Sequence, residues 1–156
     1  MAVNNYAKLK IKYKLPDHKK LSELLELEID TGKTDILLIQ EIRNNITDRL
    51  YDFMKTIEAI LFTGEGSDPA HLYQEEMIHD SSKEGFELFK KFNELYYEGF
   101  SLRFRHDRAA DADFINRIFK SWPEIEKKLI KFFGSLEGGW KEFNLSTELK
   151  HENYHG

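Results

Sequence analysis

The chain has 156 residues, a length that fits one domain with a single core. Hydrophobic residues make up 40% of the sequence and charged residues 33%, and no apolar run approaches the roughly 18 residues of a membrane span, so the composition argues against disorder and against a membrane helix. Cysteine is absent, which excludes disulfides, thiolate nucleophiles and Cys-based metal sites and leads us to expect a reducing, cytoplasmic location.

The net charge of −5 is unevenly distributed along the chain. Residues 1–20 hold six lysines and Asp17, a charge of +5, so the other residues together carry −10. An acidic body repels phosphate groups, and we therefore expect nucleic acid to be a poor partner.

Residues 7–15 alternate between apolar and basic side chains, which predicts a half-buried strand. Pro16 ends the pattern, so residues 1–16 are predicted to form a basic N-terminal strand segment. A strand needs a partner for its backbone, and the candidates are residues 25–30, residues 143–149 and the same strand of a second copy. The strand's lysines either guard its edge against aggregation or bind RNA or acidic lipid; they are Lys8, Lys10, Lys12 and Lys14.

Two long helices are predicted next, because apolar residues recur every three or four positions from residue 35 to 62 and again from residue 69 to about 105. A third helix is predicted over residues 109–120. A fourth is expected to start at residues 121–124 (SWPE), which read as a capping box with an early proline, and to run to Gly134. The apolar residues of the second long helix form its predicted core line, which comprises Leu72, Phe86, Phe89, Tyr96, Phe100 and Phe104.

The sequence thus predicts a mainly α fold in a single domain over residues 1–156. The expected architecture is a bundle built on two long antiparallel helices, with two or more shorter helices. A small β element is expected from residues 7–15, with residues 143–149 as a possible second strand. Residues 150–156 are expected to be a disordered tail.

Two patterns contain residue types that bind metals. His151 and His155 belong to an H-E-x-x-H motif, the spacing found in zinc peptidases, but the chain offers no third ligand after it and we attribute the match to chance. Glu76 and His79 have the E-x-x-H spacing of helical di-iron proteins, with Glu75 beside them. A second E-x-x-H is absent, so we expect a structural histidine and no metal or other cofactor.

A cluster of basic residues lies at the predicted turn between the second and third helices. Arginine binds phosphate or carboxylate through two parallel hydrogen bonds, and the next helix offers its N-terminus nearby. The alternative is a favourable charge at a helix C-terminus with surface ion pairs. The candidate anion-binding residues are Arg103, Arg105, His106 and Arg108.

These features lead us to expect a helical protein that acts by protein–protein association, as a homodimer and without catalytic residues. Helices of about 28 and 38 residues are roughly 40–55 Å long, more than one small core can cover, so part of their aromatic length should form an interface. The first alternative is a metal-binding protein or metal-dependent enzyme that uses His79 with Glu75 or Glu76. The second is an RNA-associated subunit that uses the lysine strand together with the turn at residues 103–108.

Overall fold

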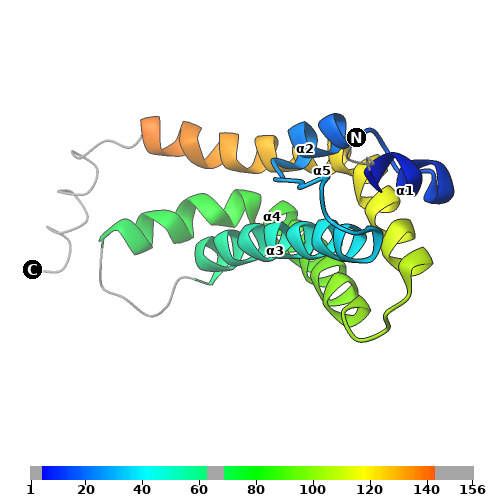
Figure 1. The fold of residues 1–156 in the computed structure, drawn as a ribbon. Helices are drawn as coiled ribbons and strands as arrows, with labels where there is room; N and C mark the ends of the chain where they lie inside the picture. The colour runs from blue at the N-terminus through cyan, green and yellow to red at the C-terminus, as the bar shows by residue number, and fades with distance from the viewer. Residues whose placement is uncertain (1–4, 63–68, 143–156) are drawn as a thin grey trace, which may run out of the picture.

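The computed structural model describes residues 5–62 and 69–142, with side chains described for residues 5–62 and 82–138. These residues form helices joined by short connections, and no strand occurs among them (Figure 1). The predicted mainly α class is therefore confirmed. The helices are α1 (Asn5–Tyr13), α2 (His18–Leu25), α3 (Asp35–Leu61), α4 (Pro69–Leu102) and α5 (Arg108–Glu142).

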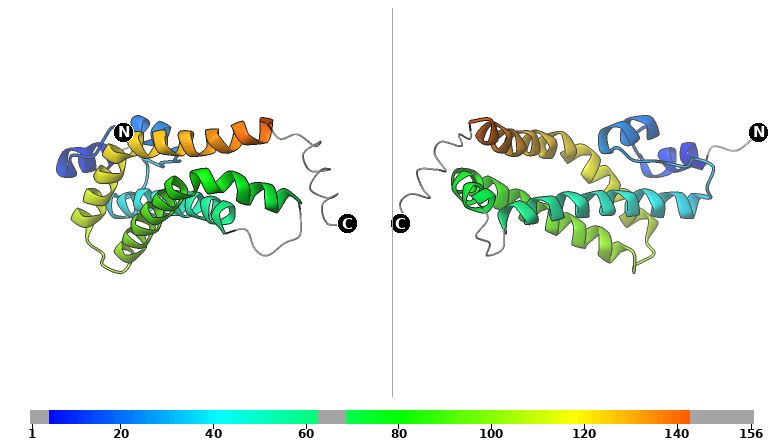
Figure 2. Two further views of the ribbon diagram at one scale, coloured as in Figure 1. Left: turned by 180° about the vertical axis from the view of Figure 1, so that it is seen from behind. Right: turned by 90° about the vertical axis from the view of Figure 1, so that its left-hand side faces the viewer.

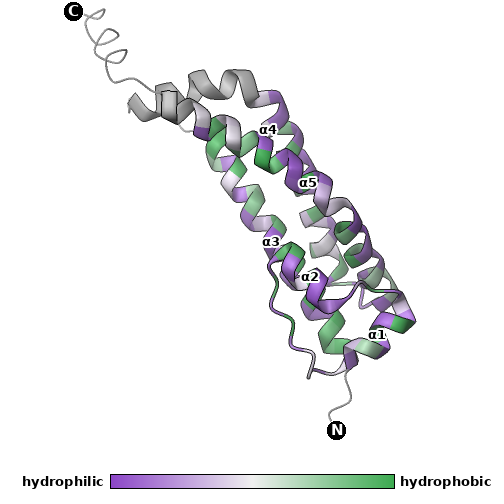
Figure 3. Ribbon diagram, turned by 90° about the horizontal axis from the view of Figure 1, so that it is seen from above, coloured by the Kyte–Doolittle hydropathy of each residue, from purple (hydrophilic) through white to green (hydrophobic). Residues whose placement is uncertain are grey.

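The long helices α3 and α4 lie side by side and run in opposite directions, and α5 returns along them (Figures 1 and 2). α1 and α2 pack at one end, against α3 and α5. Seen from the side of α1, α2 and α5, much of the surface of α2 and α5 is hydrophilic (Figure 3). The apolar residues of the five helices meet in one buried cluster between the helices.

The predicted strand over residues 7–15 is wrong, because this segment forms α1. Tyr6, Leu9 and Tyr13 are three and four residues apart, so the sequence also contains a helical stripe, and burial of that stripe decides the structure. Leu15, the last residue of the alternation, follows the helix. Lys14 adopts a left-handed conformation (φ 53°), and the Leu15 N–H donates to the Lys10 carbonyl, which closes the helix and buries Leu15.

The structure describes one of the two segments proposed as strand partners and not the other. Residues 26–30 connect α2 to α3 and contain no strand. Residues 143–149 lie outside the described residues, as does the tail over 150–156.

The two helices predicted over residues 109–134 are one helix, α5, which continues through Pro123. The predicted capping box is absent, since the Ser121 hydroxyl donates to the carbonyls of Arg117 and Ile118 inside the helix. Proline has no N–H for the carbonyl four residues earlier, and α5 bends in this region (Figures 1 and 2). Trp122 is buried against Phe53 and Phe92, so packing holds the helix together across the proline.

The core face of α4 also differs from the prediction. Phe86, Phe100 and Phe104 were expected inside, but they are 47%, 37% and 71% exposed. The buried line of α4 lies on a neighbouring face and includes Gly99. Its apolar members are Leu88, Phe92, Leu95 and Leu102.

Gly99 allows α4 to approach α3 closely. A Cβ atom at this position would lie 2.3 Å from the Thr47 hydroxyl oxygen and 2.9 Å from Cζ of Phe114. Thr47 in turn donates to the Arg43 carbonyl one turn earlier in α3. The contact fixes the register of α3 against α4 and thereby decides which face of α4 remains outside.

Candidate interaction surface

The four lysines of the predicted strand lie on and just after α1, where all four are exposed. Lys10 forms an ion pair with Asp17 (3.3 Å), the residue that caps the N-terminus of α2. The hydrogen bond from the Lys19 N–H and, after it, the contact with Lys10 favour the carboxylate and hold the pKa of Asp17 below its usual value. The other three lysines of the predicted strand are Lys8, Lys12 and Lys14.

The basic residues of the turn between α4 and α5 are not a common anion site. Arg103 is bound to Asp48 of α3 (2.8 Å) and stacks over the ring of Phe100. Arg105 and His106 are exposed and Arg108 is half-buried. The N-terminus of α5, the other predicted anion-binding element, is capped by Asp107, which accepts hydrogen bonds from the backbone N–H groups of residues 109 and 110.

The lysines of α1 and this turn are separated along α5. Asn116 of α5 donates to the Tyr13 carbonyl at the end of α1 (3.2 Å), eight residues after the start of α5. Eight helical residues correspond to about 12 Å, and the first turns of α5 lie between the two basic groups (Figure 1). The RNA-binding alternative requires one shared basic face and gains no support from this arrangement.

The metal-binding candidates fall on residues whose side chains the structure does not describe. Glu75, Glu76 and His79 belong to the first part of α4, and His151 and His155 lie beyond residue 142. Among the side chains that are described, no group of three His, Asp or Glu could hold a metal ion.

Exposed aromatic rings gather along α3 and α4, and we refer to them as the aromatic surface. The rings of α4 at positions 86, 97 and 100 are eleven and three residues apart, so they follow one side of the helix over about 21 Å. Phe104 follows two residues after the end of α4. The members and their exposed fractions are Tyr51 (39%), Phe62 (51%), Phe86 (47%), Tyr97 (63%), Phe100 (37%) and Phe104 (71%).

Ring contacts join the aromatic surface into two groups, one around Phe62 and Phe86 and one from Tyr51 to Phe104. Tyr51 of α3 contacts Tyr96 of α4 (centroids 5.2 Å apart), and Phe62 contacts Phe86 (5.5 Å). Along α4, Tyr96 continues to Phe100 (6.0 Å), and Phe100 continues to Phe104 (5.5 Å). Packed rings of this kind have little conformational freedom left to lose on contact with another surface.

The aromatic surface faces away from α5. Phe53 of α3 contacts Trp122 of α5, and Tyr51 lies two residues earlier. Two residues correspond to a rotation of about 200° around a helix, so Tyr51 points to the opposite side of α3. The exposed rings are thus not part of the interface that already holds α5.

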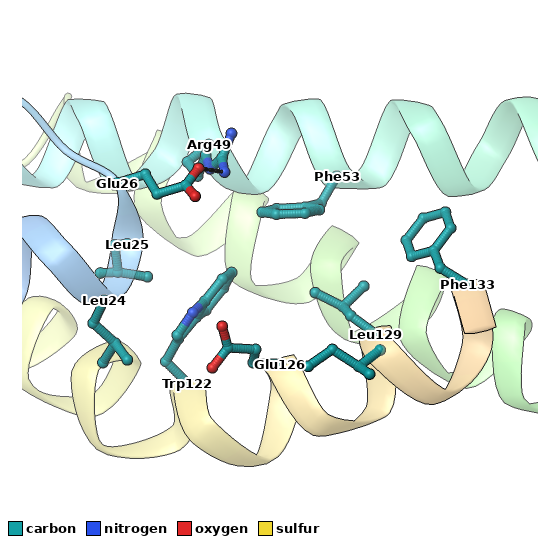
Figure 4. Close-up of a pocket in the computed structure, with 10 residues that line it drawn as sticks. Leu24, Leu25, Glu26, Arg49, Phe53, Trp122, Glu126, Leu129 and Phe133 are labelled. Atoms are coloured by element: carbon teal, nitrogen blue, oxygen red, sulfur yellow. Dashed lines mark hydrogen bonds and ion pairs between the residues drawn. The ribbon is translucent and has the colours of Figure 1, made fainter.

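A cavity of about 250 Å³ lies between α2, α3 and α5 (Figure 4). Phe53 and Trp122 face each other across it, and Leu129 adds to the apolar lining. Arg49 is bound to Glu26 and lies over the ring of Phe53, which leaves Glu126 as the charged residue of the lining with no ion pair among the described residues. The cavity therefore offers apolar packing but few free polar groups to orient a ligand.

The sequence analysis missed a buried ion pair between Arg43 of α3 and Asp111 of α5. Arg43 is 3% exposed and Asp111 is 0% exposed, and the guanidinium Nη1 lies 2.7 Å from Oδ1 of Asp111. The same nitrogen donates to the Leu102 carbonyl at the end of α4 (3.1 Å). Arg43 thereby joins all three long helices.

The second carboxylate oxygen of Asp111 is buried and has no hydrogen-bond donor among the described residues. Burial raises the pKa of Asp111 above its usual value, although the ion pair with Arg43 acts in the opposite direction. Since the two residues are 68 positions apart and stand among other charged residues, the sequence alone gave no signal for the pair.

Comparisons with protein-family models, with curated proteins and with solved structures find no match to this chain. No helix in the described part of the chain is both long and apolar enough to span a membrane. The function must therefore be argued from the geometry itself.

Proposed function

We propose that this protein acts by association through its aromatic surface, without catalytic residues, and that its partner is a second copy of the chain. The observation that supports the proposal is the set of six exposed rings on α3, α4 and the residues that directly follow each helix. Single exposed apolar residues are ordinary in any protein, whereas groups of contacting exposed rings on one side of the molecule are typical of an interface.

The size of the aromatic surface fits this role. The six exposed fractions correspond to about three whole aromatic side chains, or roughly 600 Å² of surface. A standard interface covers about 800 Å² on each partner, including its polar rim. Aromatic residues also contribute a large share of binding energy in such interfaces.

The proposal is tested by substituting Tyr97, which lies midway along the aromatic surface and is 63% exposed. Tyr97→Asp places a charge among the rings, and we expect the dimer to dissociate at least tenfold more readily. The matched control is Ile11→Asp, which changes an 83% exposed residue of α1 and should leave association unchanged. Sedimentation equilibrium and light scattering over micromolar concentrations measure both.

Circular dichroism distinguishes lost association from lost folding, because the Tyr97 variant should keep its helical signal. A wild-type protein that is monomeric throughout this range would contradict the proposal. Equal dissociation of the two variants would contradict the assignment to the aromatic surface.

A further inference from the structure

We infer that the second copy docks with its α4 antiparallel to the first, about a two-fold axis beside Leu95 and Tyr96, so that Glu87 of each copy meets Arg105 of the other. The inference rests on the proposed function and adds the geometry of the dimer to it. Two features of α4 and of the turn that follows it support the inference, one apolar and one charged.

The apolar feature is the spacing of the terminal rings. Phe86 and Phe104 lie at the two ends of the aromatic surface. Phe100 is fourteen residues after Phe86, close to four helical turns, and therefore lies on nearly the same side of α4. Phe104 follows the end of α4 by two residues, and its ring packs against Phe100 (centroids 5.5 Å apart). A two-fold axis midway between Phe86 and Phe104 places Phe86 of each copy over Phe104 of the other and covers the whole row of rings.

The charged feature is the unequal charge at the two ends of the same row. Glu87 and Arg105 are both exposed, and neither forms an ion pair within the described residues. They are eighteen residues apart, and each follows one of the terminal rings by one residue. The acidic group thus lies at one end of the aromatic surface and the basic group at the other.

The direction of packing follows from these two charges. A parallel arrangement would set Glu87 against Glu87 and Arg105 against Arg105, which is repulsive at both ends. The antiparallel arrangement forms the attractive pair twice, because a two-fold axis repeats every contact. Each copy therefore carries both the acidic and the basic group that the other copy needs, as an interface between identical chains requires.

Charge reversal tests the pairing. Glu87→Arg and Arg105→Glu should each weaken the dimer about tenfold, since each change converts two attractive pairs into two repulsive ones. The double variant restores opposite charges and should return to within about threefold of the wild-type dissociation constant. A parallel dimer predicts no such recovery, because its like-charge contacts persist in all four proteins.

The absence of cysteine allows an independent distance measurement with single spin labels. Ser101→Cys and Lys83→Cys introduce labels at exposed positions on α4 at different distances from the axis. At 1.5 Å per residue, the antiparallel dimer predicts separations of about 20 Å between labels at 101 and about 40 Å between labels at 83. A parallel dimer predicts equal separations at both positions.

The outcomes separate this inference from the proposed function. A dimer with equal label separations, or with charge-reversed variants that bind like the wild type, overturns the antiparallel geometry and leaves association through the rings standing. A monomeric wild type without any label–label distance overturns both.

Discussion

Arg43 of α3 forms hydrogen bonds to both of the other long helices. It binds Asp111 of α5 and the carbonyl of Leu102 in α4, and its remaining nitrogens reach Asn44 within α3. Removing a charge from water costs several kcal/mol, and a buried pair stabilises a protein only if its geometry offsets that cost. One oxygen of Asp111 has no donor among the residues that the structure describes, which indicates that the compensation is incomplete.

This arrangement predicts a specific pattern of stability. Arg43→Met and Asp111→Leu should each lower the free energy of unfolding by about 3–5 kcal/mol, because each leaves a buried charge without its partner. The double variant removes both charges and should lie within about 2 kcal/mol of the wild type. Urea denaturation of the four proteins gives the coupling energy directly.

An exposed ion pair serves as the control. Asp113 is bound to Arg117 on the surface of α5, and its side chain is 67% exposed. Asp113→Ala should change stability by less than about 1 kcal/mol. If the effects of Arg43→Met and Asp111→Leu simply added in the double variant, the two buried charges would not be coupled.

At the scale of single elements, α1 shows how two patterns compete in one segment. Residues 7–15 alternate as a strand does, yet Tyr6, Leu9 and Tyr13 also fit a helix. A strand would point Leu9 and Ile11 to the same face. The helix buries Leu9 (2% exposed) and leaves Ile11 83% exposed.

These two residues therefore provide the test of α1. Leu9→Ala should lower the free energy of unfolding by about 2–5 kcal/mol, the range for removing a buried leucine. Ile11→Ala should stay within about 0.5 kcal/mol of the wild type, as is usual for exposed positions. Similar large losses in both variants would show that the segment packs as a half-buried strand.

The long helices were predictable because their periodicity extends over many turns, and α3 ends within one residue of its predicted limit. The single helix α5 was not, since SWPE at residues 121–124 is a valid start signal that only tertiary packing overrides. Trp122 supplies that packing by filling the space beside Phe53 and Phe92. A local signal of this kind cannot reveal a distant partner.

At the scale of the whole molecule, the core face of α4 was the feature that sequence could not decide. Aromatic residues occur on two neighbouring faces of α4, and both have helical spacing. Gly99 and its close contact with Thr47 select the face that turns inward. The predicted core line consequently became much of the aromatic surface, while the candidate anion residues dispersed into separate contacts.

Association should also be visible in thermal stability, because the folded dimer binds a partner that the unfolded chain does not. A tenfold rise in protein concentration adds about 1.4 kcal/mol to the unfolding free energy of a dimer that separates as it unfolds. Two chains of 156 residues have an unfolding entropy of about 0.65 kcal/mol/K, so Tm should rise by about 2 °C per tenfold increase. Differential scanning calorimetry between 1 and 100 µM would measure a total shift of about 4 °C in the wild type. The Tyr97→Asp variant should show a smaller rise in Tm over the same range, because less of its folded form is dimeric, and a constant Tm in the wild type would show that dimerisation does not stabilise the fold.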